Sequence, residues 1–242
     1  MKPVGAIETV KTESAATNGP NGELDVTEKT RIRRGPTKAV LERDVMNQII
    51  DECYVCHLGF SDGDEPFVIP TLGWRDGETL YIHGSRGSRL LKVLKAGGSA
   101  CITFTILDGL VMARSAFHHS ANYRSVMVFG RPALVASKSE KLRALKVLMN
   151  QISPGRWDQT RETNDQEVTA TDVLSLQLKE VSVKVRAGDP IDDEADLATP
   201  IWAGILPIKQ KVGPPVDALD NLAGQSPEDY SVAFGDRWFD IN

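Results

Sequence analysis

Two short polar segments carry the residue types best able to hold a small anionic or aromatic ligand. Tyr123-Arg124-Ser125 opens a predicted strand that continues with alternating valines, and residues 83–89, His-Gly-Ser-Arg-Gly-Ser-Arg, join a predicted strand to a predicted helix. Guanidinium and hydroxyl groups bind phosphate oxygens through charge-assisted hydrogen bonds, and glycines allow close backbone approach. Backbone amides at a helix start also favour an anion. For each segment alone, a solvated strand end or turn is the competing interpretation.

Two further patterns contain metal-ligand residue types but have weaker support. Cys53 and Cys56 have the CxxC spacing that can ligate zinc or carry redox chemistry. They lie in one predicted strand and no second CxxC follows, so small buried residues are the favoured interpretation. His118 and His119 are adjacent in a predicted loop without an HExxH pattern, so plain surface histidines are favoured and no metal is predicted.

The composition is that of a globular protein and excludes several classes of partner. Of 242 residues, 41% are hydrophobic and 25% charged, and 28 basic against 33 acidic residues leave a net charge of −5. This balance lacks the basic footprint of a nucleic-acid-binding protein. No segment approaches the about 18 apolar residues of a membrane span, and the polar start of the chain is unlike a signal peptide. With three cysteines and no disulfide framework, we expect a cytoplasmic protein without nucleic-acid or membrane partners.

The distribution of apolar residues divides the chain into three parts. Residues 1–35 contain almost no aromatic residues and are predicted to be a disordered tail, because they cannot bury enough apolar surface to offset the entropy of ordering. Residues 36–210 contain the predicted regular elements. Residues 211–242 are rich in Pro and Gly near their start and are predicted to be a loose tail.

Alternating apolar residues and DG turns predict a series of strands joined mainly by hairpins. The expected strands are 53–60, 66–74, 78–83, 99–107, 110–115 and 123–136. Helices are expected after Thr37, around residues 90–94, and over 138–152, where Ser137 and Glu140 form a capping box. Residues 156–170 are charged and are predicted to be a loop.

The segment 174–185 changes its alternation phase. Its leucines occupy even positions up to residue 178 and its valines occupy odd positions from 181, so a bulge or bend is expected near Lys179-Glu180. Strands that bend in this way are typical of barrels. With six or seven strands and three helices at the periphery, the sequence predicts a mainly β fold, an antiparallel barrel with helical additions.

These segments together make the chain similar to the pyridoxamine 5′-phosphate oxidase-like flavoproteins, the FMN-binding split barrels, and within them to the nitroimidazole-resistance (Nim) branch. The resemblance covers about residues 36–207. Its marks, in chain order, are Pro66–Pro70, Leu80–Gly84, Gly87–Leu90 and Tyr123–Gly130. The resemblance implies a six-stranded antiparallel split barrel that forms a homodimer, with FMN in each of two clefts between the subunits.

The resemblance also implies a set of cofactor-binding residues. The segment 69–72 would line the isoalloxazine ring, 82–84 would lie beside the flavin and its ribityl chain, and 88–89 would hold the phosphate. Residues 123–125 would complete the site, and the match of Trp202 to a C-terminal tryptophan near the flavin is loose. The full set is Ile69, Pro70, Thr71, Leu72, Ile82, His83, Gly84, Ser88, Arg89, Tyr123, Arg124, Ser125 and Trp202.

Two departures from the oxidases narrow the expected function. Arg89 is followed by Leu90 where the oxidases have a lysine, so Arg86 or Arg124 would have to pair with one negative charge of the phosphate. No Arg-x-His signature follows Trp202, which puts oxidation of pyridoxamine phosphate in doubt.

The leading prediction is therefore an FMN-dependent oxidoreductase for a small molecule, with nitroaromatic reduction as one option and NAD(P)H as a candidate electron donor. His83 would be the catalytic proton donor, since an unperturbed histidine has a pKa near 6.5. Two alternatives stay open. One is a flavin-binding carrier or sensor without turnover. The other is a haem-handling split barrel, because the fold also hosts haem proteins and the histidines permit haem binding.

Overall fold

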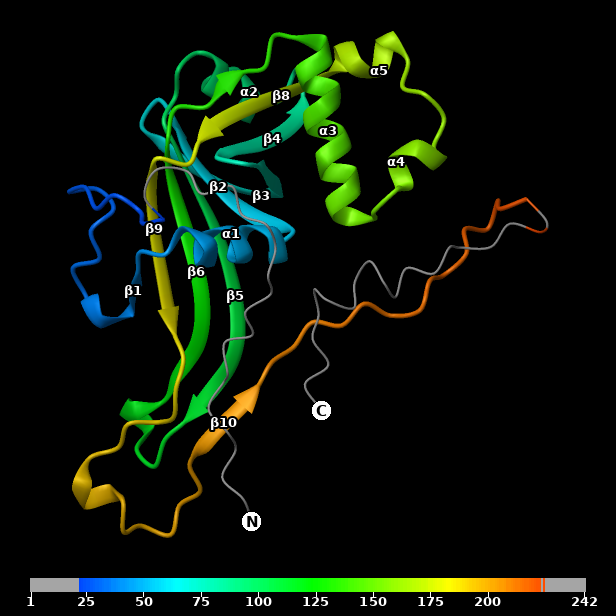
Figure 1. Ribbon diagram of the computed structural model, residues 1–242. Helices are drawn as coiled ribbons and strands as arrows, with labels where there is room; N and C mark the ends of the chain where they lie inside the picture. The colour runs from blue at the N-terminus through cyan, green and yellow to red at the C-terminus, as the bar shows by residue number, and fades with distance from the viewer. Residues whose placement is uncertain (1–21, 223, 225–242) are drawn as a thin grey trace.

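A computed structural model describes residues 22–222 and 224 of the chain. These residues form one antiparallel sheet of ten strands: β1 (Ala39–Val40), β2 (Val55–Asp62), β3 (Glu65–Asp76), β4 (Thr79–Ser85), β5 (Ala100–Met112), β6 (Ser120–Gly130), β7 (Ala133–Leu134), β8 (Thr171–Gln177), β9 (Glu180–Arg186) and β10 (Gly204–Pro207). The strand order is β1-β9-β6-β5-β2-β3-β4-β8-β7, and β10 pairs with β5. The mainly β, antiparallel prediction is confirmed, and the sheet stays open between its two ends (Figure 1).

Helices lie around one end of the sheet and across its middle (Figure 1). They are α1 (Arg43–Glu52), α2 (Arg89–Lys95), α3 (Lys138–Ile152), α4 (Arg156–Gln159), α5 (Asp165–Ala170) and the short 3₁₀ turns η1 (Pro36–Lys38), η2 (Ala116–His118) and η3 (Glu194–Asp196). The bounds of α3 agree with the prediction, and the Ser137 hydroxyl accepts a hydrogen bond from the Glu140 amide. α2 also lies where the leucines predict it.

Two helix predictions are wrong. The first helix begins at Arg43 and not after Thr37, because Thr37 lies in η1 and the next two residues form β1, which pairs with β9. The predicted loop 156–170 contains α4 and α5. The start of α5 is stabilised by a capping box, in which the side chains of Asn164 and Glu167 each accept a hydrogen bond from the other residue's backbone amide. This pair is a local helix-start signal, but it lies in a charged segment whose composition suggests a loop.

The predicted turn at Asp108-Gly109 is also wrong. β5 continues through these residues with a register shift against β6 between Leu107 and Gly109. The chain reverses later, through η2, so residues 110–115 are not a separate hairpin strand. Tertiary contacts explain the difference, because the Asp108 carboxylate pairs with Arg124 and its carbonyl accepts from the Ile208 amide at 3.0 Å.

The change of phase near residues 179–180 marks a corner between two strands. β8 pairs with β4 and β7, whereas β9 pairs with β6 and β1, so the two strands belong to opposite ends of the sheet. The predicted bend is therefore present, but it lies between β8 and β9 and is not a bulge within a single strand.

Two clusters of apolar side chains form the core. The larger one lies inside the curved sheet and includes Phe104 from β5, Met46 from α1 and Leu91 from α2, all fully buried. The smaller one lies between α3 and β3–β4 and contains Trp74 and Tyr81. Residues 22–35, assigned to the tail by the sequence analysis, contact the domain: Leu24 is only 5% exposed and packs into the larger cluster.

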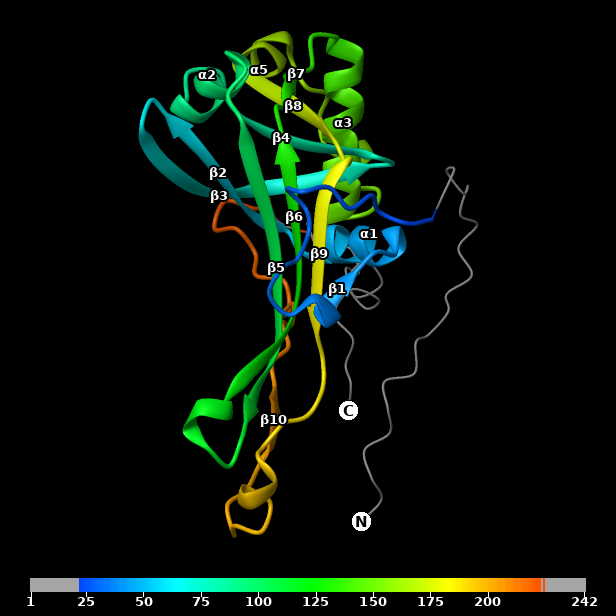
Figure 2. The same ribbon diagram turned by 90° about the vertical axis from the view of Figure 1, so that its left-hand side faces the viewer.

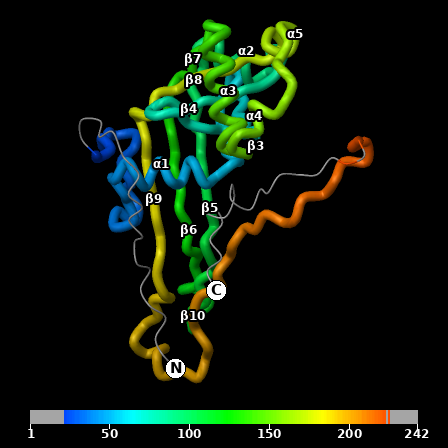
Figure 3. Tube along the Cα trace, turned by 45° about the vertical axis from the view of Figure 1, so that its right-hand side comes forward, coloured from blue at the N-terminus to red at the C-terminus, as the bar shows by residue number. Residues whose placement is uncertain are grey.

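An arm extends from the sheet on the side opposite α2–α5 (Figures 1 and 2). We define the arm as residues 107–122, the far ends of β5 and β6 with η2 between them, and residues 189–208, which include η3 and β10. An ion pair joins its two loops: Arg114 Nη1 lies 2.8 Å from Asp192 Oδ2, and the Arg114 amide donates to the same carboxylate at 2.7 Å. The Asp192 side chain is buried, and that of Arg114 is partly exposed. Beyond β10 the described chain runs away from the sheet (Figure 3).

Candidate functional site

β3 and β4 part from each other at the position where the sequence predicts flavin-binding residues. Their ladder ends at the pair Gly73 and Ile82. Before that point β3 pairs only with β2, through residues 65–72, and after it β4 pairs only with β8, through residues 83–85. The facing edges of Ile69–Leu72 and His83–Gly84 therefore have no ladder partners in the described chain. Backbone donors and acceptors at such an edge are available to a ligand.

His83 lies at this opening and is half-buried. Its ring meets the Trp74 ring edge-on, with centroids 5.6 Å apart, and its Nδ1 is buried with no hydrogen-bond partner among the described residues. Burial lowers the pKa of His83, because an apolar environment disfavours the charged form. The pKa is therefore below the ordinary value that the sequence analysis assumed, and burial favours the neutral imidazole. The proton-donor role of His83 stays a prediction.

A basic surface hollow lies beside the end of β4. It encloses about 620 Å³ and is lined by Gly87, Arg89 and Lys92 together with Asp62, Val93 and Ala96. The Arg89 guanidinium stacks over the Phe67 ring at 4.5 Å and its Nε is 3.7 Å from an Asp62 oxygen, while the side chain stays 59% exposed. Ser88 is less free, because its hydroxyl accepts from the Leu91 amide at 3.3 Å and caps α2. Lys92 extends the basic group, although the sequence analysis did not select it.

Arg86 belongs to a second ionic group that fixes the start of β8 against α2. The Asp172 carboxylate is 2% exposed and contacts Lys95 Nζ at 2.5 Å and Arg86 Nε at 3.5 Å. Burial alone raises the pKa of Asp172, but the hydrogen bond and charge of Lys95, with the charge of Arg86, hold it below its usual value. Arg86 is therefore already paired within the chain.

This pairing predicts a pH-dependent loss of stability. Because the pKa of Asp172 is lower in the folded state, its contribution is complete above the unfolded pKa of about 3.9 and disappears as the pH falls through the folded pKa. Asp172→Asn is expected to lower the free energy of unfolding by about 2–4 kcal/mol at pH 7, and this difference should shrink below about pH 4. Urea unfolding between pH 7 and 3 measures it.

The control is Asp165→Asn, which removes the partner of Lys138 from an ion pair whose aspartate is 89% exposed. Exposed pairs contribute little, so this variant should unfold like the parent at each pH. An equal and pH-independent loss in both variants would contradict the role given to Asp172.

The residues predicted on β6 lie in a different environment. Arg124 is held by two carboxylates: its Nη2 is 2.9 Å from Glu52 Oε1 and its Nε is 3.1 Å from Asp108 Oδ2. Burial alone lowers the pKa of Arg124, but these hydrogen bonds and charges raise it above its ordinary value. The Ser125 hydroxyl donates to the Lys184 carbonyl at 3.4 Å, and Tyr123 is half-buried beside it.

Within one chain, the two polar segments are not neighbours in the sheet, because β5 and β2 lie between β6 and β3. Glu52 and Asp108 were missed by the sequence analysis, and no local pattern marks them as partners of Arg124. Trp202 lies on the arm, is 64% exposed and covers Gly204, where an added Cβ would lie 2.8 Å from the indole ring. The structure thus brings together the predicted residues of β3, β4 and α2, and places those of β6 and Trp202 elsewhere.

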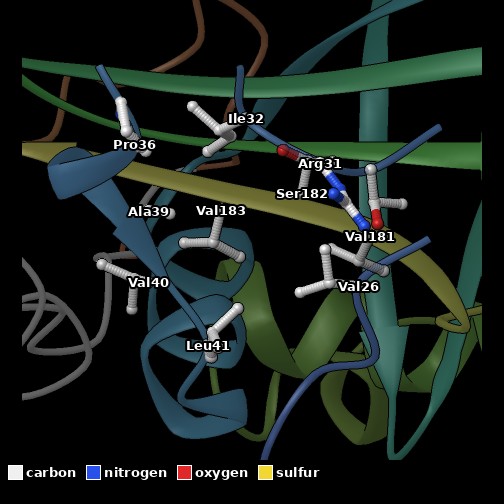
Figure 4. A pocket seen from close by; sticks show the side chains of 11 residues that line it. Val26, Arg31, Ile32, Pro36, Ala39, Val40, Leu41, Val181, Ser182 and Val183 are labelled. Atoms are coloured by element: carbon white, nitrogen blue, oxygen red, sulfur yellow. The ribbon is translucent and has the colours of Figure 1, made fainter. Parts of the chain in front are cut away.

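A second pocket, of about 300 Å³, contains none of the predicted residues. It lies between residues 26–41 and β9, and apolar side chains such as Val26, Ile32 and Val183 line it (Figure 4). Cys53 and Cys56 also form no joint site: Cys56 is fully buried on β2, and burial raises its pKa to about 12, as expected for a small apolar residue.

Residues 42–185 match the family model described as pyridoxamine 5′-phosphate oxidase. The chain belongs to this family. Two solved structures are similar over most of both chains. The flavocytochrome Anf3 from Azotobacter vinelandii is 38% identical, with a TM-score of 0.80 over 84% of this chain and 94% of that one. The FAD and heme binding protein from Mycobacterium smegmatis is 32% identical, with a TM-score of 0.76 over 79% of this chain and 94% of that one.

A proposed 5-nitroimidazole antibiotic resistance protein from Bacteroides thetaiotaomicron shares the fold, with 22% identity and a TM-score of 0.52 over 61% of this chain and 86% of that one. The resemblance to the oxidase-like split barrels, Nim-type proteins included, is therefore confirmed. No curated protein matches the chain. Among the described residues, no helix combines the length and apolar character needed to cross a membrane.

Proposed function

We propose that this protein binds a flavin at the opening between β3 and β4, also binds a haem, and acts as an oxidoreductase. The observation that carries the proposal is the similarity, over about four fifths of the chain, to a flavocytochrome and to an FAD and heme binding protein. When bound, a flavin supplies one- and two-electron chemistry and a haem supplies one-electron chemistry. The protein supplies binding, orientation and electrostatics.

The residues at the opening fit a flavin. The unpaired edges of Ile69–Leu72 and His83–Gly84 offer backbone hydrogen bonds to a polar ring edge. Arg89 and Lys92 supply positive charge for a phosphate in the adjacent hollow. Burial of His83 favours its neutral form, and its Nδ1 has no partner among the described residues, so the imidazole can donate or accept one hydrogen bond at the ring.

The flavin is more specifically FAD in this proposal. The sequence resemblance implies FMN, but one of the two similar proteins is named for FAD. A dinucleotide carries a second phosphate, and the open hollow beside Arg89 and Lys92 offers both space and charge for it. A homodimer that completes the flavin site, and NAD(P)H as electron donor to a small-molecule substrate, belong to the same proposal.

The absorption spectrum of the purified protein tests the function directly. The expected result is a flavin spectrum together with a Soret band, both changed by dithionite, with FAD identified after release by chromatography. A flavin without a Soret band would favour the FMN-type reductase or a flavin carrier. Protein that takes up neither FAD, FMN nor hemin would contradict the proposal.

Replacing both Arg89 and Lys92 with alanine is expected to weaken FAD and FMN binding by at least about 10-fold, since a hydrogen bond to a charged group contributes about 1.5–3 kcal/mol. Riboflavin lacks the phosphate, so its affinity should be the same in parent and variant. Flavin fluorescence titration measures all three ligands. The control is Arg161→Ala, because Arg161 is exposed and pairs only with groups of its own loop and α5. Equal losses for riboflavin and FMN would contradict a phosphate role.

A further inference from the structure

The arm exposes more apolar surface than a solvated hairpin needs. Phe117, in η2, is 96% exposed, and Ile191 in the opposite loop is 80% exposed. Leu110 on β5 and Leu206 on β10 are register partners, so they lie side by side, and they are 42% and 46% exposed. Exposed apolar side chains gathered on one arm offer a binding surface to a large apolar group.

His119 follows Phe117 by two residues on the arm and has one ring nitrogen free. Its Nδ1 lies 2.9 Å from the Ser115 carbonyl oxygen. A carbonyl can only accept, so Nδ1 carries the proton and the Nε2 lone pair is left for another partner. The side chain is exposed, and the described residues offer no hydrogen bond to Nε2. This is the arrangement of metal-binding histidines, whose second nitrogen donates to a carbonyl or carboxylate that fixes the tautomer.

The other three histidines lack this arrangement. His118 has a buried Nδ1 without a partner, and its Nε2 faces Asp193 at 3.9 Å, in a group with Asp196. His83 also has a buried, unpartnered Nδ1 and lies at the opening assigned to the flavin. His57 is exposed on β2, with no bond that sets its tautomer among the described residues.

We propose that His119 is an axial ligand of the haem, through Nε2, and that the porphyrin covers the exposed apolar side chains of the arm. The inference rests on the haem binding proposed above and names its ligand. The Arg114–Asp192 pair ties the loop that carries Ile191 to the segment that leads into η2, so the two loops of the arm are joined.

Hemin titration of three single variants of the full chain tests the assignment: His119→Gly, His118→Gly and His83→Ala. The Soret band and the hemin affinity are measured, together with flavin content. In His119→Gly the Soret band of the parent should be lost and the hemin affinity should fall by at least about 10-fold, because removal of an outer-shell partner of a metal ligand already costs that much. Flavin content should be unchanged, and added imidazole should restore the Soret band.

The adjacent histidine is the matched control, so His118→Gly should keep the parent band and an affinity within a few-fold. His119→Gly with the parent Soret band would overturn the inference, and so would loss of that band in His83→Ala or His118→Gly alone. If added imidazole does not restore the Soret band in His119→Gly, the loss comes from a disturbed loop, and the inference that His119 is an axial ligand is overturned as well. If the parent protein itself binds no hemin, the haem part of the proposed function fails instead.

Discussion

Replacing Arg124 with alanine is expected to lower the free energy of unfolding by about 2–4 kcal/mol, less than the about 3–5 kcal/mol of a fully buried pair because the cluster is partly solvated. The guanidinium bridges Glu52 on α1 and Asp108 on β5, whose side chains are 25% and 33% exposed. Without Arg124, two half-buried carboxylates lose their common counter-charge. Chemical denaturation measures the loss.

Two comparisons separate this role from cofactor binding. In a Glu52→Gln/Asp108→Asn background the same substitution should cost clearly less, because no carboxylate is left uncompensated. The loss should also persist after the flavin has been stripped, since all three partners belong to one chain. A loss confined to the flavin-loaded protein would instead support the sequence prediction that Arg124 holds the cofactor, which stays a prediction.

Trp74→Ala is expected to have the largest effect of any single substitution considered, about 3–5 kcal/mol of unfolding free energy. Trp74 is 1% exposed, stacks on Tyr81 and donates from Nε1 to the Ala144 carbonyl at 2.8 Å. It therefore joins β3 and β4 to α3 directly behind the opening. The substitution also removes the surface against which His83 rests, so weaker flavin binding should accompany the loss of stability.

Trp202→Ala is the matched control, because Trp202 is the same residue type but 64% exposed. Its stability cost should stay within about 0.5 kcal/mol. Trp74→Phe keeps most of the apolar packing and loses the hydrogen bond, which should cost about 1–2 kcal/mol. Thermal and urea unfolding of the three variants compare them, and a Trp74→Ala variant as stable as the parent would refute the role of this core cluster.

The sequence was most informative where the site is built from consecutive elements. The predicted residues of β3, β4 and α2 lie together because two short turns join these elements, and such turns are encoded by adjacent residues. Basic residues one helical turn apart, Arg89 and Lys92, share the hollow for the same local reason.

The sequence was least informative where distant partners decide the outcome. Asp108-Gly109 has the composition of a turn, yet the pairing with β6 and β10 keeps it extended. Arg124 is paired within the chain with Glu52 and Asp108, 72 and 16 residues away, and no local pattern predicts these partners. Its role at the cofactor stays a prediction. The ordinary pKa assumed for His83 failed for the same reason, because burial depends on the elements packed around it.

By itself, then, the sequence determined the antiparallel β class, the helix over 138–152, and the family resemblance carried by residues 66–130. These features depend on periodicity, caps and turns, whose energetics are settled within a few residues. Only the tertiary structure decided that β3 and β4 part at Gly73 and Ile82, which charges are already neutralised, and which histidine has a free nitrogen on an apolar surface. Those properties arise from contacts between elements far apart in the chain, and no local pattern records them.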